Sequence, residues 1–224
     1  MSKSSPFLSS SFHCCGHSIS HFSGRNILAS ASADQTVKLW DMATLACLRS
    51  FEHHKDKVQS LEWNPSEGSV LLSGSYDRTV AAFDTRVPDA VSMWKVSADV
   101  ECVKWNPSEP QYFLVSTEDG MVTCIDARQN GGKPVFTLRF VIFFPRSCPL
   151  FFSMCSSWLS SAHDEAVCAL HFNPRIPNCL VTGSYDKTVK VWDIKDNKPT
   201  CMISRDLGIV LFLPAVAFPP PLFY

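Results

Sequence analysis

The stretch LLSGSYDRTVAAFD at residues 71–84 recurs in variant form at three other places in the chain. The variants are LASASADQTVKLWD at 28–41, LVSTEDGMVTCID at 114–126 and LVTGSYDKTVKVWD at 180–193. The first three copies end 43 and 42 residues apart, and the fourth ends 67 residues after the third. Internal similarity at a period of about 20 to 50 residues is typical of proteins built from structural repeats.

A second motif repeats in phase with the first. LEWNPS at 61–66, VKWNPS at 103–108 and LHFNPR at 170–175 are separated by the same 42 and 67 residues. Deleting the 22 residues 140–161 shortens the long step to 45, so both series regain their period. We therefore interpret 140–161 as an insertion resembling translated intron, and the chain as a partial or mis-assembled product.

Each repeat contains short β-rich segments separated by polar turns. The segment VQSLEW at 58–63 is one such strand, and Asn64-Pro65 ends it because proline cannot donate to a β-ladder. The tetrad YDKT at 185–188 has the composition of a hairpin turn, and no segment shows a helical period. The pattern predicts an all-β fold, a partial β-propeller of about four four-stranded antiparallel blades in an incomplete ring.

The repeats resemble those of the WD40 repeat family. The Trp-Asp dipeptide of that family occurs at 40–41 and 192–193, and its upstream histidine at His54 and His163. The sequence is most similar to the periodic tryptophan protein 1 family, in the stretches RNILASASADQTVKLWDM, HKDKVQSLEWNP, SGSYDRTV and SRDLGIVLF.

This resemblance implies a non-catalytic protein-interaction scaffold in the nucleus and nucleolus, with roles in ribosome biogenesis, rRNA transcription and processing, and chromatin association. Its partners would be other proteins, such as pre-ribosomal or chromatin components. The alternative is a generic WD40 adaptor in another intracellular pathway, such as a ubiquitin-ligase substrate receptor. A fold by itself does not choose between them, because one fold hosts many functions.

The resemblance also implies a buried hydrogen-bonded tetrad of His, Ser or Thr, Asp and Trp within a repeat. A polar group in a propeller core needs such partners. The fourth repeat offers His163, Thr182 or Ser184, Asp186 and Trp192; the second offers His54, Ser73 or Ser75 and Asp77, with Phe83 in place of Trp; the first offers Ser30 or Ser32, Asp34 and Trp40; and the third keeps Asp119, with Ile125 in place of Trp.

A candidate partner-binding face lies at the turns. Tyr76 and Tyr185 each precede the turn aspartate, and Glu118 holds the same place in the third repeat. WD40 relatives commonly dock peptides on this face, and an exposed tyrosine is a good contact residue. Arg78 and Lys187 lie two residues further on and could add charge. The alternative is that each tyrosine is half-packed on its own turn.

Composition and motifs argue against other classes of protein. The formal net charge is −1 with no basic stripe, so there is no direct nucleic-acid signal. The Ser, His and Asp residues recur in successive repeats without a G-x-S-x-G motif, which favours a structural role over an enzyme. The ten cysteines show no C-x-x-C or zinc-ligand spacing, so we expect no metal, no cofactor and no small-molecule substrate.

We expect three parts in the chain. Residues 1–24 match no repeat and are expected to be disordered, 25–206 form the propeller arc interrupted by 140–161, and 207–224 are the truncated start of a further blade. The segments outside the repeats hold 11 of the 16 phenylalanines but only two charged residues. Their apolar stretches are broken by prolines, so we expect no membrane span.

Overall fold

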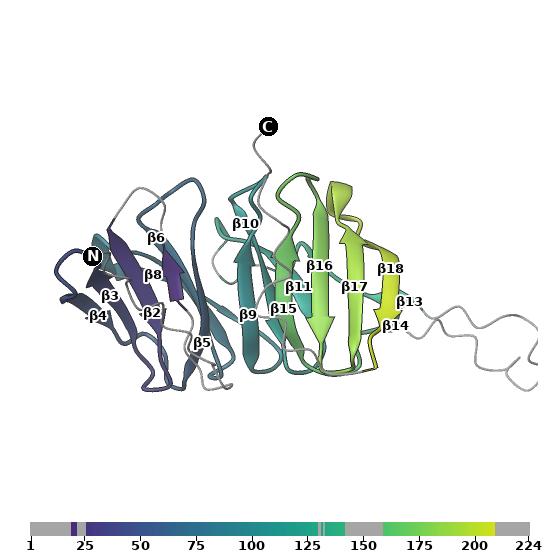
Figure 1. The fold of residues 1–224 in the computed structure, drawn as a ribbon, viewed down its shortest axis with the longest axis horizontal. Coiled ribbons are helices and arrows are strands. Elements are labelled where there is room, and N and C mark those ends of the chain that lie inside the picture. Colours follow the sequence, from purple (N-terminus) through teal and green to yellow (C-terminus); the bar gives the residue numbers. More distant parts are fainter. Residues whose placement is uncertain (1–18, 22–25, 130, 132, 142–158, 209–224) are drawn as a thin grey trace, which may run out of the picture.

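The computed structural model describes residues 19–21, 26–129, 131, 133–141 and 159–208. Four four-stranded sheets follow one another along the chain (Figure 1). The first sheet contains β1 (Ile19–His21), β2 (Ile27–Ala31), β3 (Val37–Asp41) and β4 (Cys47–Phe51). The second contains β5 (Val58–Trp63), β6 (Val70–Ser75), β7 (Thr79–Asp84) and β8 (Val87–Lys95).

The remaining strands build two more such sheets and one short hairpin. The third sheet contains β9 (Val100–Trp105), β10 (Tyr112–Thr117), β11 (Val122–Asp126) and β12 (Phe136–Thr137). The fourth contains β15 (Val167–Phe172), β16 (Cys179–Ser184), β17 (Thr188–Asp193) and β18 (Thr200–Asp206). The hairpin pairs β13 (Phe140–Val141) with β14 (Leu159–Ser160), and the 3-10 helix η2 (Lys195–Asn197) lies between β17 and β18.

Within each sheet, consecutive strands pair antiparallel, and the sheets meet through their first strands. β5 packs against β1 on one side and β9 on the other, and β9 in turn packs against β15. The sheets therefore succeed one another side by side, as the colours of Figure 1 show. This arrangement confirms the prediction of an all-β partial propeller with four four-stranded blades.

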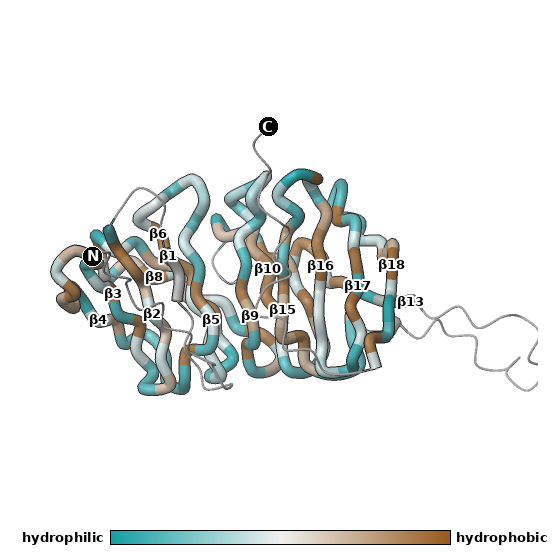
Figure 2. Tube along the Cα trace, viewed as in Figure 1, coloured by the Kyte–Doolittle hydropathy of each residue, from teal (hydrophilic) through white to brown (hydrophobic). Residues whose placement is uncertain are grey.

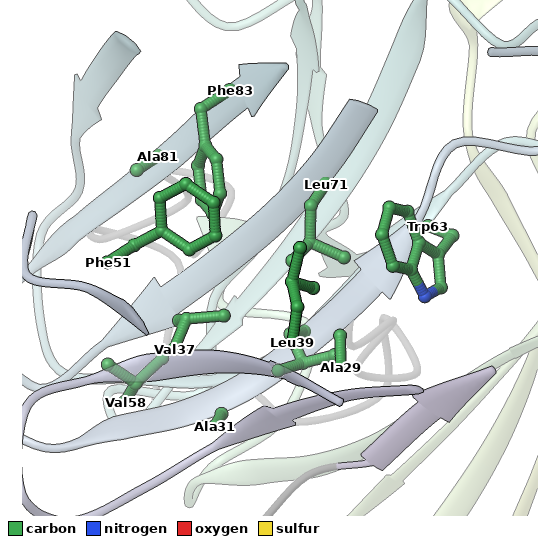
Figure 3. Close-up of a cluster of buried hydrophobic side chains, with 11 residues drawn as sticks. Ala29, Ala31, Val37, Leu39, Phe51, Val58, Trp63, Leu71, Ala81 and Phe83 are labelled. Carbon is green, nitrogen blue, oxygen red and sulfur yellow. The ribbon is translucent and has the colours of Figure 1, made fainter. Parts of the chain in front are cut away.

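The hydrophobic core lies between neighbouring sheets rather than at one centre. Successive residues of a strand point to opposite faces, so Leu71 packs into the cluster shared with the first sheet and Leu72 into the cluster shared with the third. Figure 3 shows the former cluster, where Phe51 and Phe83 lie against each other, their ring centroids 4.8 Å apart. Both faces of β6 are buried, which explains why apolar residues such as Leu71 and Leu72 follow one another there. Figure 2 shows the same concentration of hydrophobic residues along the strands.

The turn between the second and third strand of each sheet has one backbone geometry. The fourth residue of the turn donates its N–H to the carbonyl three residues earlier in all four sheets. That fourth residue has a left-handed backbone at Gln35, Arg78, Gly120 and Lys187, with φ of 72°, 62°, 78° and 67°. Non-glycine residues pay roughly 1 kcal/mol for this conformation, which the surrounding hydrogen bonds must offset.

One expectation about the chain's parts needs correction. Strand β1 pairs with β2 and lies inside 1–24, where no strand was expected; its few residues carry little strand signal, and the exposed edge of β2 supplies the pairing. The fourth strand of the third blade, β12, is only two residues long. Of the insertion, the structure describes the ends at β13 and β14; the middle (142–158) lies outside the described residues, as do 1–18 and 209–224. Across the described residues, no helix is long and apolar enough to cross a membrane.

Candidate functional site

A continuous line of hydrogen bonds crosses the fourth sheet. Trp192 on β17 donates its indole N–H to Oγ1 of Thr182 on β16 at 2.9 Å. Thr182 Oγ1 lies 2.6 Å from Nε2 of His163, and His163 Nδ1 lies 2.9 Å from Oδ2 of Asp186. One proton arrangement satisfies every member: indole to hydroxyl, hydroxyl to Nε2, and Nδ1–H to carboxylate. The tautomer with the proton on Nδ1 is assigned by this pattern.

Burial keeps the histidine of this network, His163, uncharged. Burial lowers the pKa of His163 below its ordinary value, and the charge of Asp186 only partly opposes that shift. Burial on its own would raise the pKa of Asp186, but hydrogen bonds from Thr188 and His163 outweigh it and lower that pKa. Asp186 also accepts the main-chain N–H of Asp164 at 3.1 Å. The network therefore fixes the turn at 185–188 to the segment that enters β15.

The second sheet holds the same network without its tryptophan. His54 Nε2 lies 2.8 Å from Ser73 Oγ, and His54 Nδ1 lies 3.1 Å from Asp77 Oδ2. Phe83 takes the place of the tryptophan and is 2% exposed. It packs against Phe51 instead of donating a hydrogen bond. Burial also lowers the pKa of His54.

The first and third sheets hold only fragments of such a network among the described residues. In the first sheet, Trp40 donates to Ser30 Oγ at 2.9 Å. Asp34 is exposed and accepts hydrogen bonds from its own turn rather than joining Trp40. In the third sheet, Asp119 is also exposed and bonds to Thr117, two residues before it. Asp34 and Asp119 therefore join no histidine or tryptophan, and among the described sheets the fourth alone holds all four members of the tetrad.

The structure chooses between the paired hydroxyls that the sequence leaves open. Of these alternatives, the hydroxyls that meet His or Trp are those of Ser30, Ser73 and Thr182. Ser75 and Ser184 lie at the ends of their strands and donate to main-chain carbonyls of Asp56 and Glu165, both at 3.0 Å. The later hydroxyl is therefore used to close the turn, and the mid-strand hydroxyl serves the network.

Tyr76, in the turn between β6 and β7, joins two neighbouring blades. Its hydroxyl donates to Oε1 of Glu101 at 2.8 Å, and Lys57 Nζ lies 3.6 Å from the centroid of its ring. Burial and the hydrogen bond to Glu101 raise the pKa of Tyr76 above its usual range, and Tyr185 and Glu118 add to the shift. Tyr76 thus contacts Glu101 of the next blade and Lys57, which precedes the first strand of its own blade.

Glu118 donates its main-chain N–H to Asp99, and the carbonyl of Gly120 accepts from His163 at the entrance to the fourth sheet. Tyr185 donates to Ala166 at that same entrance, so the turns of three blades lie in one region.

Charged side chains surround this region. Arg78 Nε lies 3.3 Å from Oδ1 of Asp99, so it is paired across the two blades. Glu118 and Lys187 are exposed, whereas Tyr185 is half-buried. The turns that carry Tyr76, Glu118 and Tyr185 are called the turn face below.

Sequence reasoning missed the residues that hold the turn face together. Lys57, Asp99 and Glu101 all lie at the start of the first strand of a sheet, β5 or β9, a position with no sequence motif of its own. Only their position in the repeat could have indicated them, because the first strand of a sheet begins beside the turn of the preceding blade. Glu62 and Lys104 were also missed, although both lie within the repeated motifs at 61–66 and 103–108; their 2.8 Å ion pair joins β5 to β9. In the part of the chain that the structure describes, no three His, Cys, Asp or Glu residues are grouped to hold a metal ion.

Comparisons with known proteins agree with this geometry. The WD40 family, described as "WD domain, G-beta repeat", matches residues 4–41, 45–84 and 152–193. Periodic tryptophan protein 1 of Saccharomyces cerevisiae is 34% identical over 198 residues, covering 83% of this chain and 31% of that protein. The periodic tryptophan protein 1 homolog of Drosophila melanogaster is 34% identical over 172 residues, covering 75% of this chain and 32% of that protein.

A more distant relative is a protein of a different kind. The E3 ubiquitin-protein ligase COP1 of Arabidopsis thaliana is 29% identical over 175 residues, covering 78% of this chain and 22% of that protein. The chain spans about a third of the length of the two periodic tryptophan relatives. Since matches to one repeat family cover more than half of its residues, the chain belongs to the WD40 repeat family.

Proposed function

We propose that this chain is a non-catalytic protein-interaction scaffold of the nucleus and nucleolus that serves ribosome biogenesis, rRNA transcription and chromatin association. Similarity to periodic tryptophan protein 1 over most of the chain supports this placement. The observation that carries the binding role is the turn face, where Tyr76, Glu118 and Tyr185 come from three successive blades. The partners are proteins, such as pre-ribosomal or chromatin components.

The turn face suits protein binding because the ring of Tyr76 is already held in place before a partner binds. Tyr76 is fixed at its hydroxyl by Glu101 and at its ring by Lys57. A side chain already held in place loses less conformational freedom on binding, and tyrosines are enriched among residues that dominate binding energy. The networks around His54 and His163 fix the turns beneath, because each anchors its turn aspartate.

The experiment is affinity purification with the full-length gene product and two matched charge-swap variants. Glu118→Lys with Lys187→Glu reverses two exposed charges on the turn face without changing net charge. Glu109→Lys with Arg175→Glu does the same in the opposite loops of the same two blades. We expect the wild type and the second variant to recover pre-ribosomal or chromatin proteins, and the first variant to lose them.

The second candidate function is a generic adaptor such as a ubiquitin-ligase substrate receptor, which the similarity to COP1 favours. Recovery of cullin-ligase subunits without pre-ribosomal or chromatin components would replace the first proposal by this one. Equal recovery from both charge-swap variants would remove the turn face from the proposal, whichever partners are found.

A further inference from the structure

A sheet that lies between two others packs a different face on each neighbour. In the second sheet, Leu71 and Phe83 pack towards the first sheet, whereas Leu72 and Val80 pack towards the third. We call the face towards the preceding sheet the rear face, and the face towards the following sheet the front face. Because side chains alternate along a strand, the same positions of the repeat form these faces in every sheet.

The front face of the fourth sheet is the one that no described sheet covers. The succession of first strands β1, β5, β9 and β15 ends at β15 among the described residues (Figure 1). The four central front-face positions hold Ala29, Ala31, Val37 and Leu39 in the first sheet, Leu72, Gly74, Val80 and Ala82 in the second, Leu114, Ser116, Val122 and Cys124 in the third, and Val181, Gly183, Val189 and Val191 in the fourth.

Two glycines at one position of the repeat show the difference between a covered and an uncovered front face. A Cβ on Gly74 would collide with the side chains of Val100 and Val103, so the first strand of the third sheet lies directly on this glycine. Among the described residues, a Cβ on Gly183 would meet only Ala169 of its own sheet, at 3.6 Å. The fourth sheet therefore keeps the space for a following strand without one filling it.

The fourth front face is apolar and incompletely buried. Val189 is half-buried, whereas Val80 and Val122 at the same position of the repeat are 0% exposed. Val191 is also half-buried, and Ile203, which lies opposite it on β18, is 49% exposed. A contiguous apolar face of this kind marks an interaction surface.

The rear face of the first sheet, at the other end of the arc, has no described sheet before it. Its residues Leu28, Ser30, Lys38 and Trp40 match Leu180, Thr182, Lys190 and Trp192 of the fourth rear face almost residue for residue. Leu28 and Trp40 are half-buried, but Leu180 and Trp192 are 0% exposed because the third sheet covers them. The two ends of the chain thus carry the two halves of an interface that already occurs within it.

We propose that two copies of this chain close into one ring, in which the fourth front face of each copy packs on the first rear face of the other. A second copy is the occupant because it presents the rear-face residues that a front face covers inside the chain. Four blades from each copy make eight, which is within the range known for β-propellers. The inference goes beyond the proposed function, because it concerns how the scaffold is completed and not what it binds.

The test is the molar mass of the whole chain in solution, measured by sedimentation over a range of concentrations. We expect twice the mass of one chain. Val191→Lys on the front face and Leu28→Lys on the rear face should each raise the Kd of the pair about a hundredfold, since a buried aliphatic side chain is worth about tenfold and both interfaces lose one. The matched controls Ile176→Lys and Leu45→Lys, at exposed positions in loops of the same two sheets, should pair as the wild type does.

Mixing the two interface variants tests which face meets which. Val191→Lys keeps its first rear face and Leu28→Lys keeps its fourth front face, so the mixture retains one intact interface of the two. We expect mixed pairs at concentrations where neither variant pairs alone, with weaker association than the wild type. Circular dichroism separates loss of pairing from unfolding, and Ile203→Lys provides a second front-face variant at a position exposed enough to tolerate the change.

A wild-type chain that stays single at every concentration would overturn the proposal, as would pairing unaffected by both Val191→Lys and Leu28→Lys, or a mixture that pairs no better than its components. A mass that keeps growing with concentration would refute the closed ring, because an end-to-end contact that does not close produces filaments. Pairing that appears only in Leu211→Lys would overturn the proposal by assigning the front face to 209–224 of the same chain. The Glu118→Lys, Lys187→Glu variant should pair normally, so loss of its partner proteins would concern the turn face alone.

Discussion

Replacing Thr182 by valine is the sharpest test of the network in the fourth blade. The hydroxyl of Thr182 serves two buried neighbours, the indole N–H of Trp192 at 2.9 Å and Nε2 of His163 at 2.6 Å. Valine keeps the shape but leaves both neighbours without that partner. Each buried group that loses its partner costs about 1–3 kcal/mol, so we expect a loss of about 3 kcal/mol. For a chain of this size that corresponds to a fall in Tm of roughly 6–12 °C.

The second blade provides an internal comparison. There Phe83 replaces the tryptophan, so Ser73→Ala deprives only His54 of its hydroxyl partner. We expect this change to cost about half as much as Thr182→Val. Thr182→Ser keeps the hydroxyl, removes one methyl group and should cost about 1 kcal/mol.

The assay is thermal unfolding followed by circular dichroism, with urea unfolding as an independent measure. Trp192→Phe in the Thr182→Val background completes a double-mutant cycle, which should return a favourable coupling between the two residues of about 1 kcal/mol or more. The reasoning is refuted if Thr182→Val costs no more than Thr182→Ser, or if Ser73→Ala costs as much as Thr182→Val.

Two further predictions concern the same structural elements. Burial lowers the pKa of His54 and His163 below the ordinary 6.5, so the unfolded chain takes up protons first as the pH falls. Their contribution to stability is therefore complete above about pH 6.5 and declines below it. The urea midpoint of unfolding should fall as the pH is lowered from 7.5 to 5.5. An equally steep fall in the His54→Gln, His163→Gln variant would show that these two histidines are not its cause. Gly120→Ala should lower the free energy of unfolding by more than 3 kcal/mol, because a Cβ there would clash with the carbonyl oxygen of His163. Gly131→Ala shares the positive φ but meets nothing within 4 Å, so its cost should be about 1 kcal/mol, and equal losses in the two variants would show that contact with His163 is not the cause.

The repeat was enough to predict the fold, and the resemblance to WD40 repeats supplied the chemistry of the networks. Strand segments such as 58–63 and turn tetrads such as 185–188 carry local signals, because apolar residues and turn formers occupy fixed places in every copy. Repetition also restricts the interpretation: a Ser, His and Asp set that recurs from blade to blade serves the blade rather than a single catalytic centre. The assignment of His163, Asp186 and Trp192 to one network came from the resemblance to WD40 repeats, mapped onto these positions.

Contacts between blades required the structure, because they join residues of different repeats and no sequence motif marks which side chains meet. Tyr76 meets Glu101, and Glu62 meets Lys104, only because inner strands from different repeats lie side by side. Strand β1 was missed for a similar reason: the edge of β2 creates a strand that its own residues hardly specify.

Local pattern thus establishes which strands and turns form, since backbone preference and side-chain alternation act over a few residues. Packing between sheets then selects which of two equivalent groups is used. Ser73 and Ser75 have the same chemistry and lie on the same face of β6, yet only Ser73 lies beside His54. Gly74 and Gly183 hold the same place in the repeat, yet among the described residues only Gly74 lies against the first strand of a following sheet, a contact that exists only where two blades meet.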